Sequence, residues 1–92
     1  MLGNQIAMTQ GVNELIRSGK IKHDDVLDIL GRFSVAEYGE IDKDSVRLNK
    51  LNIRDDISTV MGVYTVNDVK LWIITTLPAR HSNTVIMLPS EY

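Results

Sequence analysis

The spacing of apolar residues changes partway along this chain of 92 residues, at the pair Asp55-Asp56. Before the pair, apolar side chains recur every three or four residues, which is the period of a helix with one buried face. After it, they alternate or run continuously, as they do in strands. Because helices of this kind must bury their apolar faces, we expect them to pack on one face of the sheet formed by the second half. The pattern predicts an α+β fold, with residues 1–92 as a single domain.

The first half predicts three short helices. The first follows Thr9, a candidate N-cap, and ends at Gly19. The second covers about 23–33 and has a broad apolar face. The third follows Asp42, which is a second candidate N-cap. These helices are short, so their stability must come from packing rather than from helix propensity alone.

The second half predicts a three-stranded antiparallel β-meander. Its first two strands cover 57–66 and 69–76, and the third covers 84–88. Asn67-Asp68 joins the first two, because both residues tolerate the positive φ of a two-residue hairpin turn. The segment 3–8 predicts either an additional N-terminal strand or an extended arm.

Composition excludes several classes of function. The sequence contains no cysteine, which rules out disulfides, thiolate metal sites and a cysteine nucleophile. Its formal net charge is −2, so the charge of the whole molecule does not favour nucleic acid or anionic lipid. Its apolar runs are far shorter than the roughly eighteen residues that a membrane span needs. The start of the chain lacks the pattern of a signal peptide, so we expect a cytoplasmic location.

The ionisable residues form no recognisable catalytic or metal-binding pattern. His23 and His81 lie in different elements, without the spacing of metal ligands. A histidine base also needs a nucleophile and an orienting partner, and no Ser/His/Asp arrangement supplies them. Arg47, Lys50 and Arg54 share one face of the third helix, but three cations are a weak phosphate footprint and fit a solvated surface. We therefore expect a non-enzymatic protein without cofactor, metal or direct nucleic-acid contact.

Four segments resemble a family of small proteins carried by phages, plasmids and other mobile elements. They are "LGNQIAMTQGV", "VAEYGEI", "DKDSVRLNKLNI" and "MGVYTVNDVKLWIITTLPARHSNTVIMLPSEY", and the resemblance extends from residue 2 to residue 92. The last segment is the most specific, because it resembles the family's "WIITEADRSxTTxLLPEEY" motif. The residues that match are Tyr38, Gly39, Glu40, Asn49, Arg80 and Thr84, with Ser82 shifted by one position. The family's acidic "EAD" is "LPA" here, a departure that bears on any shared ligand.

The resemblance implies an accessory protein of a mobile element that acts in the cytoplasm of a host cell. Accessory proteins of this kind often blunt host defences. Anti-restriction proteins, anti-CRISPR proteins and proteins that sequester immune signals are of similar size. The resemblance therefore implies a partner or ligand that belongs to a host defence system.

An acidic loop between the second and third helices is the first candidate site. It contains Glu37, Tyr38, Glu40, Asp42 and Asp44. Such a loop would dock a host defence protein by competing with phosphates for its lysines and arginines. In the alternative interpretation, Asp42 only caps a helix and Tyr38 packs on the core.

A polar loop between the second and third strands is the second candidate site. It contains Arg80, His81, Ser82, Asn83 and Thr84. Its guanidinium, imidazole, amide and hydroxyl groups would suit a phosphate or a carboxylate, since the arginine fork matches either one. In the alternative interpretation it is a solvated turn, in which Ser82 and Asn83 bond their own backbone.

These candidate sites give alternative functions. We expect an inhibitor that binds a host defence protein, of the anti-CRISPR or anti-restriction type. The alternative is a sponge that sequesters a nucleotide immune signal through the polar loop, and a small enzyme that depends on His81 is a third hypothesis. The run Leu71 to Ile74 is apolar on both faces, which suits a central strand covered on both sides or a strand at an oligomer interface. The open edges of the meander also favour a homodimer through the apolar second half.

Overall fold

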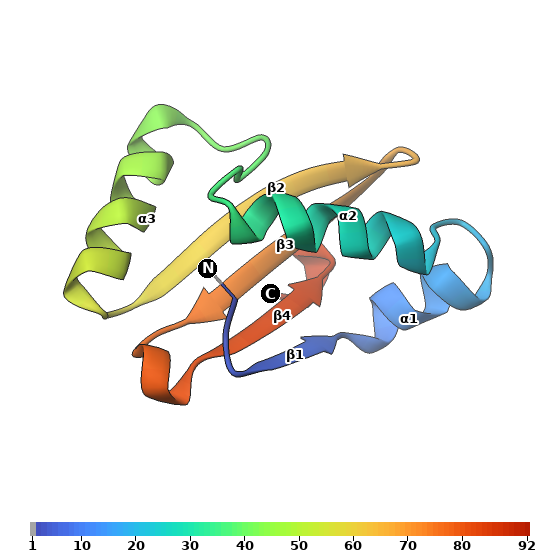
Figure 1. Ribbon diagram of the computed structural model, residues 1–92. Coiled ribbons are helices and arrows are strands. Elements are labelled where there is room, and N and C mark those ends of the chain that lie inside the picture. Colours follow the sequence, from blue (N-terminus) through green and yellow to red (C-terminus); the bar gives the residue numbers. More distant parts are fainter. Residues whose placement is uncertain (1) are drawn as a thin grey trace.

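The computed structural model describes residues 2–92 and places four strands in one sheet (Figure 1). In chain order the helices and strands are β1 (Gln5–Met8), α1 (Gln10–Arg17), α2 (His23–Ser34), α3 (Lys43–Asp55), β2 (Thr59–Val66), β3 (Val69–Thr76) and β4 (Asn83–Met87). Two short 3₁₀ turns flank β4, namely η1 (Ala79–His81) and η2 (Pro89–Glu91). Within residues 2–92, no helix combines the length and the apolarity that crossing a bilayer requires.

The sheet has the strand order β1-β4-β3-β2. β2, β3 and β4 form the predicted antiparallel meander, but β1 adds a fourth strand that runs parallel to β4. The predicted meander is thus confirmed, and the additional N-terminal strand, one of the two structures expected for 3–8, forms as β1. The sheet is nevertheless mixed rather than wholly antiparallel, because β1 runs parallel to β4. The segment before β1 is held in place by the loop that precedes β4. The Asn4 N–H donates to Ser82 O at 2.9 Å, and the Gly3 N–H donates to Thr84 Oγ1 at 2.7 Å.

The hairpin between β2 and β3 forms as predicted. Asn67 and Asp68 have φ angles of 48° and 66°. Such a two-residue turn fixes the register, and Val66 accordingly pairs with Val69.

The start of α3 was also predicted correctly. The Asp42 carboxylate accepts a hydrogen bond from the Ser45 N–H at 2.7 Å, which caps the helix. β2 begins at Thr59 rather than at residue 57, because Asp56 and Ser58 both have positive φ and cannot belong to a strand.

α1 and α2 cover one face of the sheet, whereas α3 lies along the β2 edge (Figure 1). On the covered face the strands bury Val60, Tyr64, Leu71, Ile73 and Ile86, each at most 1 % exposed. These side chains pack against Val12 of α1 and against Ile29 and Phe33 of α2. The side chains that α3 buries are two asparagines instead. α3 therefore departs from the expectation that all three helices pack on one face.

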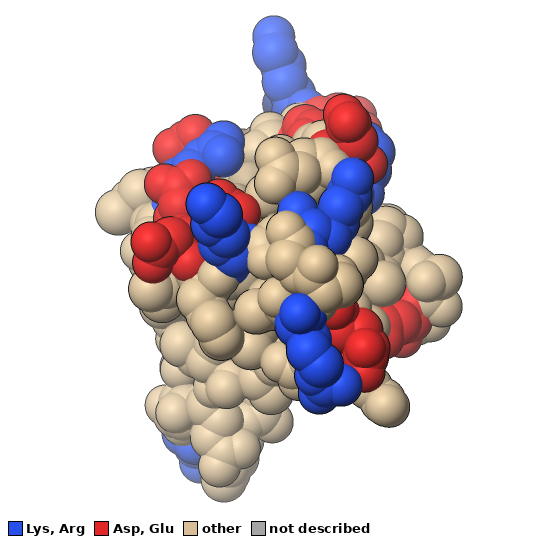
Figure 2. Space-filling view, turned by 90° about the vertical axis from the view of Figure 1, so that its right-hand side faces the viewer, with Lys and Arg blue, Asp and Glu red and all other residues tan. Residues whose placement is uncertain are grey.

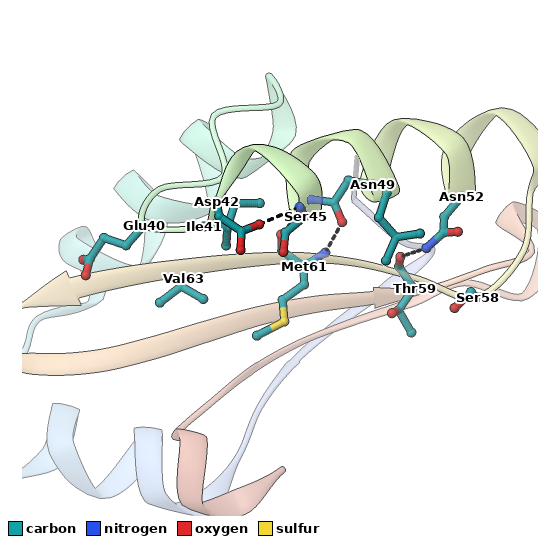
Figure 3. Close-up of a pocket in the computed structure, with 11 residues that line it drawn as sticks. Glu40, Ile41, Asp42, Ser45, Asn49, Asn52, Ser58, Thr59, Met61 and Val63 are labelled. Carbon is teal, nitrogen blue, oxygen red and sulfur yellow. Dashed lines mark hydrogen bonds between the residues drawn. The ribbon is translucent and has the colours of Figure 1, made fainter.

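The outer edge of β2 is closed by the asparagines of α3. The Asn49 amide makes two hydrogen bonds with Met61, since Nδ2 donates to the Met61 carbonyl at 2.9 Å and Oδ1 accepts from the Met61 N–H at 3.1 Å. Asn52 Nδ2 donates to the Thr59 carbonyl at 2.8 Å. These amides satisfy backbone groups that a fifth strand would otherwise pair with. Figure 3 shows both contacts.

The loop before α3 continues this closure along β2. The Val63 N–H donates to Tyr38 O at 3.0 Å, and the Glu40 N–H donates to Val63 O at 2.7 Å. Gly39 lies between these two residues with φ of 72°, and a Cβ on it would collide with the Val63 carbonyl. Only glycine fits this position.

The C-terminal segment caps the first helix. Thr9 precedes α1 as predicted, but its side chain does not cap the helix. The Glu91 carboxylate accepts instead from Thr9 Oγ1 at 2.6 Å and from the Gly11 N–H at 3.1 Å, and also from the Leu88 N–H at 2.9 Å. These hydrogen bonds, chiefly the one from Thr9, hold the pKa of Glu91 below its usual value of 4.5. The two ends of the chain are thereby joined.

We predict that Asn49→Asp destabilises the fold by at least about 2 kcal/mol, because a carboxylate oxygen would face the Met61 carbonyl with no hydrogen to donate. Protonating the new carboxyl by acidification should restore a donor and recover part of the loss. Urea unfolding, followed by Trp72 fluorescence, measures this. Asn13→Asp, which adds the same charge at an exposed site in α1, is the matched control and should change stability little. Equal effects of the two substitutions would contradict the proposed role of Asn49.

We predict that Glu91→Gln lowers the melting temperature at pH 7 and that this difference shrinks on acidification. The folded-state pKa of Glu91 is below its unfolded value, so the carboxylate stabilises the fold above the unfolded pKa. That stabilisation is lost as the pH falls through the folded pKa. Melting curves between neutral and acidic pH measure it. As a control, Glu14→Gln loses only an exposed ion pair with Arg17 and should have a smaller effect throughout.

Candidate functional site

Two of the four carboxylates of the acidic loop are engaged by neighbouring cations. The Glu37 carboxylate pairs with Arg32 Nε at 2.9 Å, and the Glu40 carboxylate pairs with Lys70 Nζ at 3.1 Å. Hydrogen bonds from Thr65 and from Lys70 hold the pKa of Glu40 below its usual range. These pairs are partly exposed, so each contributes little to stability. They nevertheless leave the loop less negative than its sequence indicates.

Two other residues of the loop have the structural roles that the alternative interpretation gave them. Tyr38 is 5 % exposed and its ring meets Phe33 edge-on, with 5.6 Å between centroids. Burial raises the pKa of the Tyr38 phenol. Asp42 caps α3, and its hydrogen bonds with Ser45 lower its pKa. Asp44 is exposed in the first turn of α3. Docking through this loop stays a prediction, with few free charges to support it.

The polar loop divides between the interior and the surface. Thr84 is 0 % exposed and Ser82 is 2 % exposed. Thr84 Oγ1 accepts from the Gly3 N–H and also shares a 2.6 Å hydrogen bond with Thr75 Oγ1. Ser82 Oγ donates to the Ala79 carbonyl at 2.9 Å. Both hydroxyls therefore hold β1 and η1 against β4 and do not face a ligand.

The other three residues of the polar loop are exposed. Arg80, His81 and Asn83 border a shallow depression of about 270 Å³, together with Asn4 and Gln5. The ion pairs within the described chain do not involve Arg80 or His81. Nucleotide binding here stays a prediction, with three of the five proposed groups on the surface. In the same range of residues, no group of three or more His, Cys, Asp or Glu side chains is placed to hold a metal ion.

A groove of about 370 Å³ lies between α3 and β2 (Figure 3). Its apolar lining includes Leu48, Met61 and Val63, while Glu40 and Asp42 lie toward one end. The amides of the asparagines in its wall are already bonded to β2. Throughout residues 2–92, every buried side-chain nitrogen or oxygen has a hydrogen-bond partner. The groove therefore suits an apolar group rather than a strongly polar ligand.

An apolar face of the sheet continues from this groove, on the side away from α1 and α2. The strand register aligns its side chains in two rows, Met61–Ile74–Val85 and Val63–Trp72–Met87. We call these six residues the open face. Ile74 is 8 % exposed and the other five are partly buried. Tyr92 lies edge-on to Trp72, with 5.4 Å between ring centroids. The open face thus consists of two adjacent apolar rows whose side chains are partly buried, apart from Ile74, which is buried.

Polar residues border the open face at both ends of the strands. One border is the row Thr59–Thr76–Asn83, and the other is the pair Thr65–Lys70. Lys70 is the single charged residue in these two borders, and its ammonium pairs with Glu40. An apolar centre with a polar rim is the usual anatomy of a protein–protein interface.

Charged residues are concentrated away from this part of the sheet. β1, β4 and β3 from Leu71 onward contain no Lys, Arg, Asp or Glu. Figure 2 shows the molecule from the right-hand side of Figure 1, where cations and anions intermingle in the upper part and the lower part carries few charges. This view contains no large field of a single sign.

The amino-acid sequence alone does not mark the open face as a site. Its signal was the run Leu71 to Ile74, in which both faces of one strand are apolar. Such a run is typical of a strand covered on both sides. In the structure, Leu71 and Ile73 face the helices, while Trp72 and Ile74 belong to the open face.

Comparisons of the chain with protein-family models, with curated proteins and with solved structures give no match in any of the three.

Proposed function

We propose that this protein is a non-enzymatic binding protein that docks a partner protein through the open face. The observation that carries the proposal is the pair of apolar cross-strand rows bordered by polar residues. A contiguous, partly exposed apolar patch with a polar rim is typical of interaction sites in folded proteins. Trp72 lies in the middle of its row and would act as the aromatic anchor, with Tyr92 beside it.

The chemistry of the surface indicates what kind of partner fits. The open face is uncharged, so a partner must present apolar side chains to it. A side chain that extends past β2 would enter the groove against Leu48 and Met61. Glu40 and Asp42 at one end of this groove are already bonded to Lys70 and Ser45, so they would add polarity to the margin but little attraction for a cation of the partner. The acidic loop then serves as part of the rim rather than as the main docking site.

The resemblance to proteins of mobile elements supports a further step in this proposal. The partner would be a host defence protein, and this chain its inhibitor of the anti-CRISPR or anti-restriction type. Inhibition by occlusion needs a surface that stays on its target, and it needs no catalytic group. A buried apolar contact serves this purpose because its strength depends little on salt.

The test is affinity capture from a host-cell lysate with wild type and with Val63→Lys. The lysine would lie in the open face and would have to be desolvated in the complex, so we expect binding to weaken by roughly tenfold to a hundredfold. Val35→Lys adds the same charge at a residue that is 74 % exposed at the end of α2, and it should leave binding unchanged. Melting curves confirm that both variants fold.

Two results would contradict this proposal. If Val63→Lys retains a stoichiometric protein partner that is lost when Glu37 and Asp44 are changed to lysine, the acidic loop is the docking site. If the wild type captures a nucleotide without any protein, and Arg80→Ala abolishes this, the chain is a sponge.

A further inference from the structure

The two edge strands of the sheet, β2 and β1, differ in whether other parts of the chain cover their outer sides. β2 is closed by hydrogen bonds from Asn49, Asn52 and the bridge at Gly39. β1, at the other edge, pairs with β4 on one side, and no strand lies beyond it within the described chain. β1 has neither a charged side chain nor a proline, the usual devices that keep edge strands from pairing. Within residues 2–92, its outer side is thus left without a neighbouring strand.

Apolar side chains lie beside this open edge. Ile6 of β1 is 49 % exposed and Leu27 of α2 is 64 % exposed. Together with Met8, Leu30 and other residues they line a hollow of about 210 Å³ between α2 and β1. Here the covered face of the sheet ends without a helix that would hide its margin. Apolar side chains and free strand pairing thus occur at the same place.

We propose that a second copy of this chain pairs with β1, antiparallel, about a twofold axis. Each copy brings the same uncharged strand, so no like charges oppose each other at the edge, and each supplies the partner that the other lacks. The same axis would bring Ile6 and Leu27 of one copy toward those of the other. A partner that binds through charged groups would find no charged side chain on β1.

A stable dimer must bury more surface than β1 alone can offer, so α2 would have to take part in the interface. A typical specific interface removes about 800 Å² from each partner. The exposed surface of this protein is 5657 Å², and a strand of four residues is too short to contribute so large a share alone. α2 adds the exposed side chain of Leu27. Gly31 follows one turn later and has open space beside it, so a second α2 could approach closely.

This pairing would have a consequence for the proposed binding surface. Antiparallel strands about a twofold axis perpendicular to the sheet keep the same face on the same side. The two open faces would then lie side by side on one continuous sheet. The inference does not rest on the proposed function, because neither Ile6 nor Leu27 belongs to the open face.

Sedimentation and crosslinking test this proposal. We expect the wild type to dimerise, and Ile6→Lys and Leu27→Lys each to weaken the dimer at least tenfold. Leu48→Lys, at a 56 % exposed site on α3, is the control and should leave the dimer unchanged. Because the chain has no cysteine, single substitutions Gln5→Cys, Ile6→Cys and Ala7→Cys report the strand pairing directly. One of them should form a disulfide-linked dimer on mild oxidation, and Leu48→Cys should not.

The crosslinking series also covers the case in which a lysine variant fails to fold. A wild type that stays monomeric at millimolar concentration would overturn the proposal. So would a dimer that ignores both lysine substitutions and crosslinks at none of the three β1 positions. If Val63→Lys dissociates such a dimer, the second copy binds at the open face instead.

Discussion

The hydrogen bonds between α3 and the outer edge of β2 determine how the rest of the molecule is arranged. The Asn49 amide pairs with both backbone groups of Met61, as a neighbouring strand would, and Asn52 extends the contact to Thr59. A helix used in this way lies along the sheet rather than across it. α1 and α2 can cover only one face, so the other face keeps its apolar side chains without a helix over them. The open face is therefore a consequence of where α3 has its polar residues.

The same arrangement makes the sheet asymmetric at its edges. Growth past β2 would require α3 and the loop at Gly39 to be displaced, together with their hydrogen bonds to β2. A strand added beyond β1 meets no such obstacle within residues 2–92, because no strand of that range lies on the outer side of β1. Any strand that joins the sheet must then join at β1. In the proposed dimer each β1 edge is occupied by the other copy, so no further copy can be added. A twofold pair uses both open edges and leaves the closed β2 edges outside.

Much of the fold could be predicted because the responsible interactions are local. Three of these interactions involve residues close together in the sequence. They are the regular spacing of apolar residues, the helix cap at Asp42 and the two-residue turn at Asn67-Asp68. β1 could not be predicted with certainty, because four residues carry almost no period and Asn4 bonds Ser82, 78 positions away. Asn49 could not be interpreted either. Asparagine in a helix usually faces water, and nothing in the sequence says that a strand edge lies opposite.

The candidate sites were difficult to predict for a similar reason, because a sequence does not show which polar atoms are already bonded within the fold. Polar residues in loops are the sites that a sequence indicates most readily. A polar group can bind a ligand, however, only if the fold does not already engage it in a hydrogen bond or an ion pair within the chain. Ser82 and Thr84 are bonded within the chain, and Glu37 and Glu40 are paired with cations. Apolar side chains are missed for the opposite reason, because in a sequence they indicate a core. Trp72 would be such a core residue if α3 crossed the sheet. Since α3 closes the edge instead, Trp72 stays only partly buried, with Tyr92 edge-on to its ring.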